Sequence, residues 1–305
     1  MRASAIDALL VLMVVIWGVN YSVIKLAFGE VRPQAFNALR MSLASIVFLA
    51  AIRVARRRAR ASGGQLSRAF YTPHQLTARD RRDLVWLGLV GHFGYQFLFA
   101  SGVAETSVSN AALIIGATPV AIAVISAALG RERIGRLHWI GAACSIVGLY
   151  FVVGHGASFG GATIRGDLLM IVSVGCWAAY TLGASRLIAR HSPLYITGTS
   201  MAIGAVPYVL LAVPQVMSVQ WRDVSAFTWI SLVLSALLAL NVSYLIWYIG
   251  VQRIGPARTS MYSNLVPIVA LAVAAAWLGE PLTREKIIGA AAVLTGVFLT
   301  RLKRS

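Results

Sequence analysis

Residues 5–28 read AIDALLVLMVVIWGVNYSVIKLAF, an almost unbroken apolar run. A helix that crosses about 30 Å of hydrocarbon needs about 20 apolar residues. The run is too long for the apolar part of a signal peptide, and no convincing cleavage site follows it. We therefore predict that this segment is retained as a first membrane span.

The rest of the chain repeats this pattern. Of its 305 residues, 58% are hydrophobic and 12% are charged, whereas a soluble domain is about 45–50% apolar and about 25% charged. Because backbone polar groups in lipid need internal partners, the spans should be α-helices, and the short alternating segments of a β-barrel are missing. We predict an all-α membrane protein with ten transmembrane helices, at residues 5–28, 34–53, 84–104, 109–129, 137–155, 168–188, 194–214, 227–250, 258–278 and 287–300.

The net charge of +17 comes from 27 Lys and Arg against 10 Asp and Glu. A basic chain can bind nucleic acid, but here the basic residues lie between the apolar blocks, as cytoplasmic anchors do. We expect no nucleic-acid partner, a lipid environment, and a multi-pass protein of the bacterial inner (cytoplasmic) membrane with both termini cytoplasmic. The long basic stretch 54–83 is interpreted as such an anchor; the alternative is a site for lipid headgroups or a partner.

The two halves of the chain resemble each other. At an offset of 160 residues, Trp17 aligns with Trp177, Pro33 with Pro193 and Met41 with Met201. At an offset of 148 residues, Gly102 aligns with Gly250, Pro119 with Pro267, Glu132 with Glu280, Gly141 with Gly289 and Gly148 with Gly296. We predict two five-helix repeats, 1–155 and 156–305. Five is odd, so the second repeat should enter the membrane inverted, as in transporters whose site lies near the midplane. The alternative is a duplicated membrane protein with another function.

These features resemble a known family. Ten spans in two sets of five, a Pro followed by Glu thirteen residues later (Pro119 and Glu132, Pro267 and Glu280), and the LGRE and LGEP ends of spans four and nine are similar to the EamA type of the drug/metabolite transporter superfamily. His92 and Tyr95 in the motif HFGY, with Trp177 in span six, resemble the YddG-like aromatic amino-acid exporters of that superfamily. The resemblance implies export of amino acids or related metabolites.

Polar and aromatic side chains interrupt four of the apolar spans at helical spacing, which places them on shared faces. The candidate substrate-binding residues are Trp17, Asn20 and Tyr21 in the first span, His92, Tyr95, Gln96 and Phe99 in the third, Trp177 and Tyr180 in the sixth, and Asn241, Tyr244 and Tyr248 in the eighth. We predict that the rings stack on a planar or apolar group in a central cavity, while the polar groups bind the charged ends of an amino acid. Alternatively, these side chains bond neighbouring helices to one another.

Pro119 and Pro267 fall near the centres of spans four and nine. Each removes a backbone hydrogen bond and kinks its helix. Paired bending points for alternating access and static kinks that shape a cavity are both open interpretations.

Charged groups within the predicted spans are few. No Asp or Glu lies in the middle of a span, so the usual carboxylate proton relay is missing and His92 is the one candidate proton carrier. We expect facilitated or exchange transport rather than proton coupling. Lys25 and Arg40 lie toward the outer ends of their spans, and we expect them to snorkel to lipid headgroups.

Among function classes, a secondary transporter is favoured: an exporter of amino acids, aromatic or other neutral ones, and related small metabolites, working by alternating access. The alternative is a multidrug or toxic-compound exporter of the same superfamily. The chain has no HExxH and no paired membrane carboxylates, so we expect neither an enzyme nor a metal or other cofactor. A channel fits an inverted repeat with an aromatic midplane less well. The oligomeric state is left open.

Overall fold

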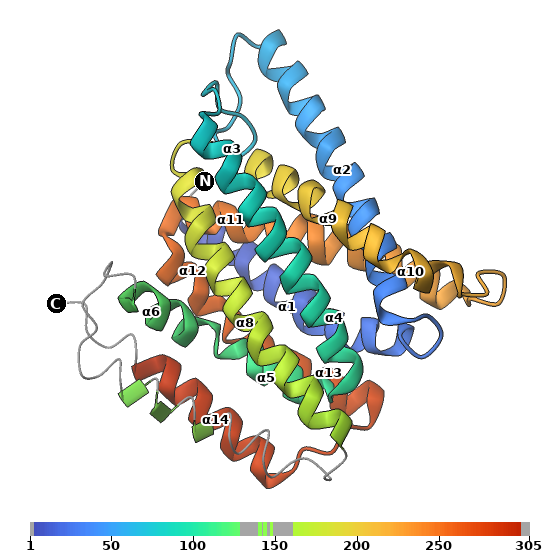
Figure 1. Ribbon diagram of the computed structural model, residues 1–305. Helices are drawn as coiled ribbons and strands as arrows, with labels where there is room; N and C mark the ends of the chain where they lie inside the picture. The colour runs from blue at the N-terminus through green and yellow to red at the C-terminus, as the bar shows by residue number, and fades with distance from the viewer. Residues whose placement is uncertain (1–2, 129–139, 142, 145–146, 149–160, 300–305) are drawn as a thin grey trace.

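The structure, a computed structural model, describes residues 3–128, 140–141, 143–144, 147–148 and 161–299 (Figure 1). All secondary structure in this part of the chain is helical. The first half contributes α1 (Ala3–Ala27), α2 (Pro33–Ala61), α3 (Ala78–Leu87), η1 (Gly88–Gly94), α4 (Tyr95–Glu105), α5 (Val108–Gly116) and α6 (Thr118–Ala128). The second half contributes α8 (Gly161–Ile188), α9 (Pro193–Met217), α10 (Ala226–Leu234), η2 (Ser235–Val242), α11 (Ser243–Ile254), α12 (Pro256–Ser263), α13 (Val266–Leu278) and α14 (Arg284–Leu299).

Seven of the helical segments are long and apolar enough to cross a membrane. They are Ala5–Ala27, Pro33–Ala61, Ala78–Glu105, Val108–Ile125, Ile164–Ile188, Pro193–Met217 and Ala226–Ile254. The predicted span 258–278 corresponds to the shorter helices α12 and α13, and the span 287–300 to α14. The predicted span 137–155 lies largely outside the described residues.

The outer surface of the bundle is apolar. Large aliphatic side chains are exposed there, including Ile46 (65% exposed), Leu210 (69%) and Met217 (80%). Large exposed apolar side chains on helices of membrane-spanning length and composition are typical of a surface in contact with lipid. The chain is therefore a multi-pass α-helical membrane protein.

Helix starts follow local sequence signals. Pro33 and Pro193 occupy the first helical positions of α2 and α9, where a missing backbone N–H costs nothing. Thr77 and Asp80 form a reciprocal capping box at α3: the Thr77 hydroxyl accepts from the Asp80 N–H, and the Asp80 carboxylate accepts from the Thr77 N–H. Because these residues satisfy or remove the free backbone N–H groups at the start of each helix, a helix can begin directly after a short non-helical connection.

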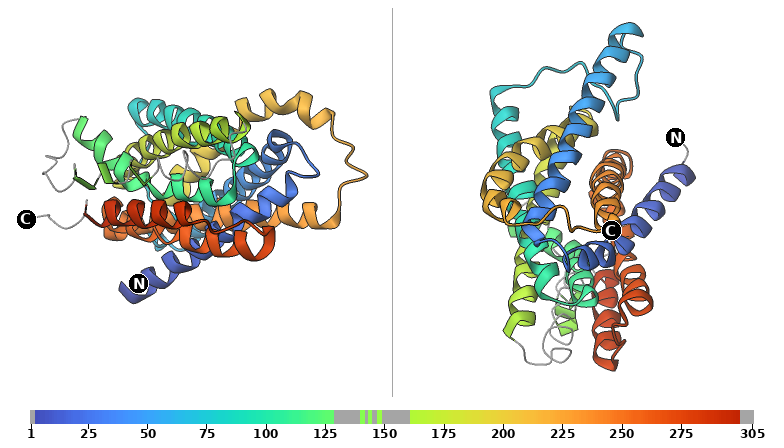
Figure 2. Two further views of the ribbon diagram at one scale, coloured as in Figure 1. Left: turned by 90° about the horizontal axis from the view of Figure 1, so that it is seen from below. Right: turned by 90° about the vertical axis from the view of Figure 1, so that its right-hand side faces the viewer.

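The segment 54–83 is not a continuous loop. Helix α2 continues to Ala61 and α3 already begins at Ala78. Arginine is a good helix former, so a helix can run on past the membrane boundary that apolar composition marks. The intervening residues pack on the start of α9, where the Leu194 N–H donates to the Ala69 carbonyl at 3.2 Å. Figure 1 and the right-hand view of Figure 2 show the C-terminal end of α2 standing beyond the other helices.

Helices from the two halves pack against each other throughout the bundle: α2 lies along α9, α4 along α8 and α1 along α13. Its interior is rich in aromatic residues. The largest fully buried side chains include Trp247, Tyr180, Tyr208, Tyr248, Phe36 and Phe48. Trp and Tyr are usually enriched at membrane interfaces. Their burial inside the bundle therefore makes its centre the first place to look for a functional site.

Candidate functional site

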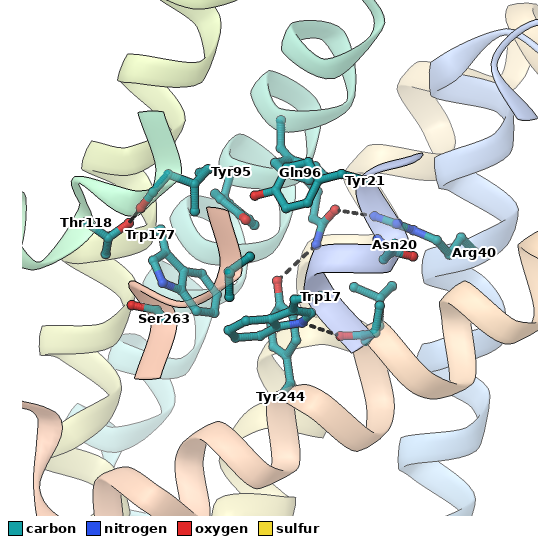
Figure 3. A pocket seen from close by; sticks show the side chains of 15 residues that line it. Trp17, Asn20, Tyr21, Arg40, Tyr95, Gln96, Thr118, Trp177, Tyr244 and Ser263 are labelled. Carbon is teal, nitrogen blue, oxygen red and sulfur yellow. Dashed lines mark hydrogen bonds between the residues drawn. The ribbon is translucent and has the colours of Figure 1, made fainter. Parts of the chain in front are cut away.

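A cavity lies at the centre of the bundle, between helices of both halves (Figure 3). Its lining residues are Trp17, Asn20 and Tyr21 of α1, Arg40 of α2, Tyr95, Gln96 and Phe99 of α4, Ile115 of α5, Thr118 of α6, Trp177 of α8, Ala239 and Leu240 of η2, Tyr244 of α11, Ser263 of α12 and Val266 of α13. Its volume is about 50 Å³. That is room for one or two water molecules, so the cavity is constricted in this structure.

Aromatic rings form the walls of the cavity. The ring centroids of Trp17 and Trp177 are 6.0 Å apart, and that of Tyr244 lies 5.2 Å from Trp177 and 6.0 Å from Trp17. Tyr95 lies 5.1 Å from Trp177 and stacks on Phe99 at 5.5 Å. Such edge and offset contacts favour a rigid wall, which suits the binding of a flat or apolar group.

Two short π-helices set the register of these residues. The segment η1 precedes Tyr95 and Gln96, and η2 precedes Tyr244, each in the middle of a long span. A π-turn inserts one residue, leaves backbone carbonyls without their usual partner and is frequent at functional sites. The indole Nε1 of Trp17 donates to a carbonyl of η2, that of Ala239, at 3.0 Å. Nothing in the residue types of 88–94 or 235–242 signals these turns.

The predicted fourth and ninth spans are interrupted close to their prolines. The fourth ends as α5 at Gly116 and restarts as α6 at Thr118, next to Pro119. The ninth ends as α12 at Ser263 and restarts as α13 at Val266, next to Pro267. The two interruptions touch: a Cβ on Gly116 would lie 2.8 Å from Cγ of Pro267. Only glycine allows this close approach.

Arg40 is a lining residue that the sequence did not single out as one. We expected it to snorkel to headgroups, but this prediction is wrong, because neighbouring helices cover its side chain to 2% exposure. Its Nη2 donates to Gln96 Oε1 at 2.9 Å and its Nη1 to Ser235 Oγ at 3.0 Å. Gln96 Nε2 in turn donates to Tyr244 Oη at 3.0 Å. A chain of polar groups thus crosses one side of the cavity (Figure 3).

Lys25 does not snorkel either. Its ammonium donates to the backbone carbonyls of Val103, Ala104 and Thr106 at 2.7–2.9 Å. A cation at a helix C-terminus satisfies free carbonyls and complements the helix dipole. Lys25 therefore fixes the end of α4 against α1, away from the cavity lining.

The structure brings together eight of the predicted binding residues, Trp17, Asn20, Tyr21, Tyr95, Gln96, Phe99, Trp177 and Tyr244, at one cavity. His92, Tyr180, Asn241 and Tyr248 are not among the lining residues. These four side chains pack outside the cavity: Tyr180 contacts His92 and Tyr248, and Asn241 contacts Ala44.

His92 lies one layer behind the cavity wall and is fully buried. Its Nε2 lies 2.9 Å from Tyr180 Oη and 3.1 Å from Ser200 Oγ. Asn241 donates from Nδ2 to the Ala44 carbonyl at 2.9 Å. For these residues the arrangement matches the alternative interpretation from the sequence, hydrogen bonding between helices. The ring of Tyr248 likewise packs against Tyr180, with centroids 5.5 Å apart.

Among the described residues that line the cavity, none is Asp or Glu. Nor do the described residues contain a cluster of His, Cys, Asp or Glu that could hold a metal ion. The described lining therefore offers aromatic rings, hydroxyls, amides and one guanidinium.

Glu280, just after the end of α13, contacts the first turn of α5. Its Oε1 accepts from the Val108 N–H at 2.7 Å, and its Oε2 accepts from the Ser109 N–H at 3.0 Å and from Ser109 Oγ at 2.5 Å. Lys286 Nζ lies 3.7 Å from the same carboxylate. A carboxylate at a helix N-terminus is a favourable cap, and this one joins the end of α13 to the start of α5, across the two halves.

Comparison with known proteins identifies the family. The profile of the EamA-like transporter family matches residues 4–154 and again residues 164–302. The two matches cover nearly the whole chain, one in each half.

Curated relatives align over almost their full length. The uncharacterized transporter YyaM of Bacillus subtilis is 27% identical, over 92% of this chain and 88% of the relative. A probable amino-acid metabolite efflux pump of Salmonella typhimurium is 26% identical, over 95% and 93%. A probable terminal-alkyne amino-acid exporter of Streptantibioticus cattleyicolor is 26% identical, over 98% and 94%.

One solved crystal structure has the same fold. It superposes with a TM-score of 0.66 at 19% sequence identity and covers 98% of this chain and 97% of its own.

Proposed function

Because the chain belongs to the EamA-like transporter family, we propose that it is a secondary transporter that exports amino acids, aromatic or other neutral ones, and related small metabolites. The observation that carries the proposal is the central cavity with its aromatic walls, lined by residues of both halves. The names of the Salmonella and Streptantibioticus relatives, an amino-acid metabolite efflux pump and an amino-acid exporter, support this substrate class.

The proposed architecture is ten spans in two inverted repeats, 1–155 and 156–305, with a pseudo-two-fold axis through the cavity. A residue and its repeat equivalent can touch only close to such an axis. Trp17 and Trp177, equivalent at offset 160, have ring centroids 6.0 Å apart. Gln96 and Tyr244, equivalent at offset 148, are joined by a 3.0 Å hydrogen bond. The π-helices η1 and η2 also correspond at that offset. These pairings support the repeat, and the odd number of spans per repeat favours inversion.

Alternating access is the mechanism we propose for the cavity. At about 50 Å³ it is far smaller than the ~300–1,000 Å³ of ordinary ligand pockets, so the halves must part to admit a substrate. The touching helix interruptions at Pro119 and Pro267 are the proposed bending points, because a helix with a missing backbone hydrogen bond bends at low cost.

We place the protein in the bacterial inner membrane with both termini cytoplasmic. The support is the concentration of arginines in the C-terminal turns of α2 and the first turns of α3, following the rule that cytoplasmic ends and connections are basic. Lipid covers the exposed apolar side chains of the outer surface.

The proposed energetics are facilitated diffusion or exchange. A proton-coupled transporter needs a titratable group that the substrate or solvent can reach, and none of the lining residues is His, Asp or Glu. His92, the sequence candidate for a proton carrier, is sealed behind Tyr180 and Ser200.

The test is counterflow of labelled amino acids into proteoliposomes. Trp177→Ala should lower the rate at least about tenfold, since a central aromatic contact contributes more than ~1.4 kcal/mol to binding. The matched control is Trp277→Ala, which removes a tryptophan that is 58% exposed and far from the lining. Equal rates in the two variants would contradict the central-site proposal. Efflux of cationic dyes without any amino-acid counterflow would favour the multidrug alternative.

A further inference from the structure

The guanidinium of Arg40 is the one charged group among the described residues that line the cavity. A buried charge is costly unless a counter-charge and hydrogen bonds satisfy it. Arginine stays protonated in proteins, so it cannot escape this cost by becoming neutral. The partners of Arg40 in the structure therefore indicate which charge a ligand of this cavity carries.

The protein supplies polar contacts to Arg40 but no anion. Arginine has five N–H donors; Nη1 and Nη2 each have one partner, the neutral side chains of Ser235 and Gln96. The Nε of Arg40 is buried and has no hydrogen-bond partner. No Asp or Glu of the described residues forms an ion pair with it.

The acidic residues around the bundle are engaged elsewhere. Asp7 accepts from Tyr262 Oη, Asp167 from Thr106 and Asn110, Glu280 from Val108 and Ser109, Glu30 from Ser225, and Asp80 from Thr77 and Arg190. None of these acids lines the cavity. A counter-charge for Arg40 must therefore come from outside the described chain.

The partners of Arg40 are themselves fixed. Ser235 Oγ donates to Asn20 Oδ1 at 2.6 Å, and Gln96 Nε2 donates to Tyr244 Oη at 3.0 Å. Because both neighbours are held by second hydrogen bonds, the guanidinium is oriented before a ligand arrives. A preorganised, desolvated guanidinium is a strong receptor for a carboxylate.

We propose that Arg40 binds the carboxylate of the transported substrate, and that this contact, rather than an ammonium contact, defines the substrate class. The rings of Trp17, Trp177 and Tyr95 hold the apolar or aromatic part of the same molecule. None of the described lining residues is an acid that could pair with an α-ammonium group. The cavity therefore takes organic monocarboxylates with an aromatic or bulky apolar substituent, whether or not they carry an α-amino group.

This inference rests on the proposed function, since it assumes that the cavity is the substrate site. It is tested first on the unaltered protein, with four probes of similar size: phenylalanine, 3-phenylpropionate, phenylalaninamide and phenethylamine. Binding is measured on detergent-purified protein by quenching of tryptophan fluorescence, because Trp17 and Trp177 line the cavity.

The two carboxylates should bind at least about 30-fold more tightly than the amide and the amine, the range expected when one partner of a buried charge pair is removed. Binding of the amide or the amine within about threefold of the carboxylates overturns the inference. Binding of none of the four probes overturns it as well.

Variants give the second test. Arg40→Gln should abolish the preference for carboxylates, and Arg40→Lys should keep a weaker preference because an ammonium keeps the charge without the planar fork. The matched control is Lys25→Gln, which removes the other cation of these spans but leaves the cavity lining intact; it should keep the full preference. An Arg40→Gln protein that folds, as shown by a single chromatographic peak, and still prefers carboxylates contradicts the inference.

Counterflow with the same probes separates the inference from the proposed function. Carboxylates that bind through Arg40 but are not transported would refute the transporter while leaving the binding site in place. Transport of phenethylamine as fast as phenylalanine would refute the role of Arg40 while leaving the transporter in place.

Discussion

Replacement of Glu280 by glutamine should open the central cavity toward the side of the membrane on which α5 begins. In the structure the Glu280 carboxylate accepts three hydrogen bonds from Val108 and Ser109 at the first turn of α5. Under the proposed mechanism α13 and α5 belong to different halves, so this contact holds only while that side is closed. Weakening it should favour the conformation in which the side is open.

The size of this destabilisation of the closed state follows from the contacts that Glu280→Gln removes. Hydrogen bonds to a charged group contribute about 1.5–3 kcal/mol, and an anion at a helix N-terminus about 0.3–2 kcal/mol. Glutamine keeps one carbonyl oxygen, so part of the hydrogen bonding survives while the charge is lost. Lys286, 4% exposed, also loses its counter-charge. We expect the closed state to lose about 1–3 kcal/mol of stability relative to the open state. This shifts the equilibrium between the two states toward the open one by about 5–150-fold.

The assay is the rate at which a cysteine in the cavity reacts with a small impermeant thiol reagent. Thr118→Cys places the thiol in the lining, in a background where Cys144 and Cys176 are replaced by alanine. The reagent is added on the side where α5 begins. Glu280→Gln should raise the labelling rate by the factor given above, because labelling follows the population of the open state.

The matched control is Glu105→Gln. Glu105 lies at the same end of the bundle and pairs with Arg165 at 3.4 Å, but the Arg165 side chain is 74% exposed. An exposed ion pair contributes only about 0–1 kcal/mol, so labelling should rise less than about fivefold. If Glu280→Gln folds normally and labels no faster than this control, Glu280 does not hold the cavity closed.

Two further predictions concern single titratable groups. His92→Gln should lower the free energy of unfolding by about 0.6–1.7 kcal/mol, the range for interhelical hydrogen bonds in membranes, and leave the pH profile of counterflow unchanged; a flattened profile would show that His92 carries a proton. The backbone N–H and hydroxyl of Ser225 donate to Glu30 and lower its pKa below the ordinary 4.5. A carboxyl whose pKa is lower in the folded than in the unfolded state stabilises the fold at pH values above its unfolded pKa. This stabilisation is lost as the pH falls through the folded pKa. The Tm should therefore fall on acidification below about pH 5, less steeply in Glu30→Gln; equal slopes would contradict the role of Glu30.

The architecture was largely readable from the sequence. Apolar runs of membrane length leave few alternatives to helices, and the prediction of an all-helical membrane protein with two related halves is confirmed by the helical structure and the two family matches. Trp17, Tyr95 and Trp177 could be predicted as candidate lining residues because, on each of their helices, helical spacing brings polar and aromatic side chains to one shared face.

Other features depend on tertiary contacts that no local pattern encodes. The π-helices η1 and η2 arise in ordinary apolar sequence. For Arg40, the distance from the helix end suggested a path to the headgroups, but that rule takes no account of neighbouring helices, which here bury the side chain. His92 has the residue type of a functional group, yet its hydrogen bonds with Tyr180 and Ser200 direct it away from the cavity.

The two halves of the proposed repeat differ in charge beside the cavity. At the offset that aligns Met41 with Met201, Arg40 aligns with Ser200. Ser200 bonds to His92 and Tyr180 behind the wall, whereas Arg40 lines the cavity. The proposed pseudo-two-fold axis relates one opening of the cavity to the other, but a cation on one side only gives the ligand a single orientation in both. A carboxylate held at Arg40 would therefore stay on the α2 side of the cavity while the helices around it exchange access, so the substrate need not turn over during transport.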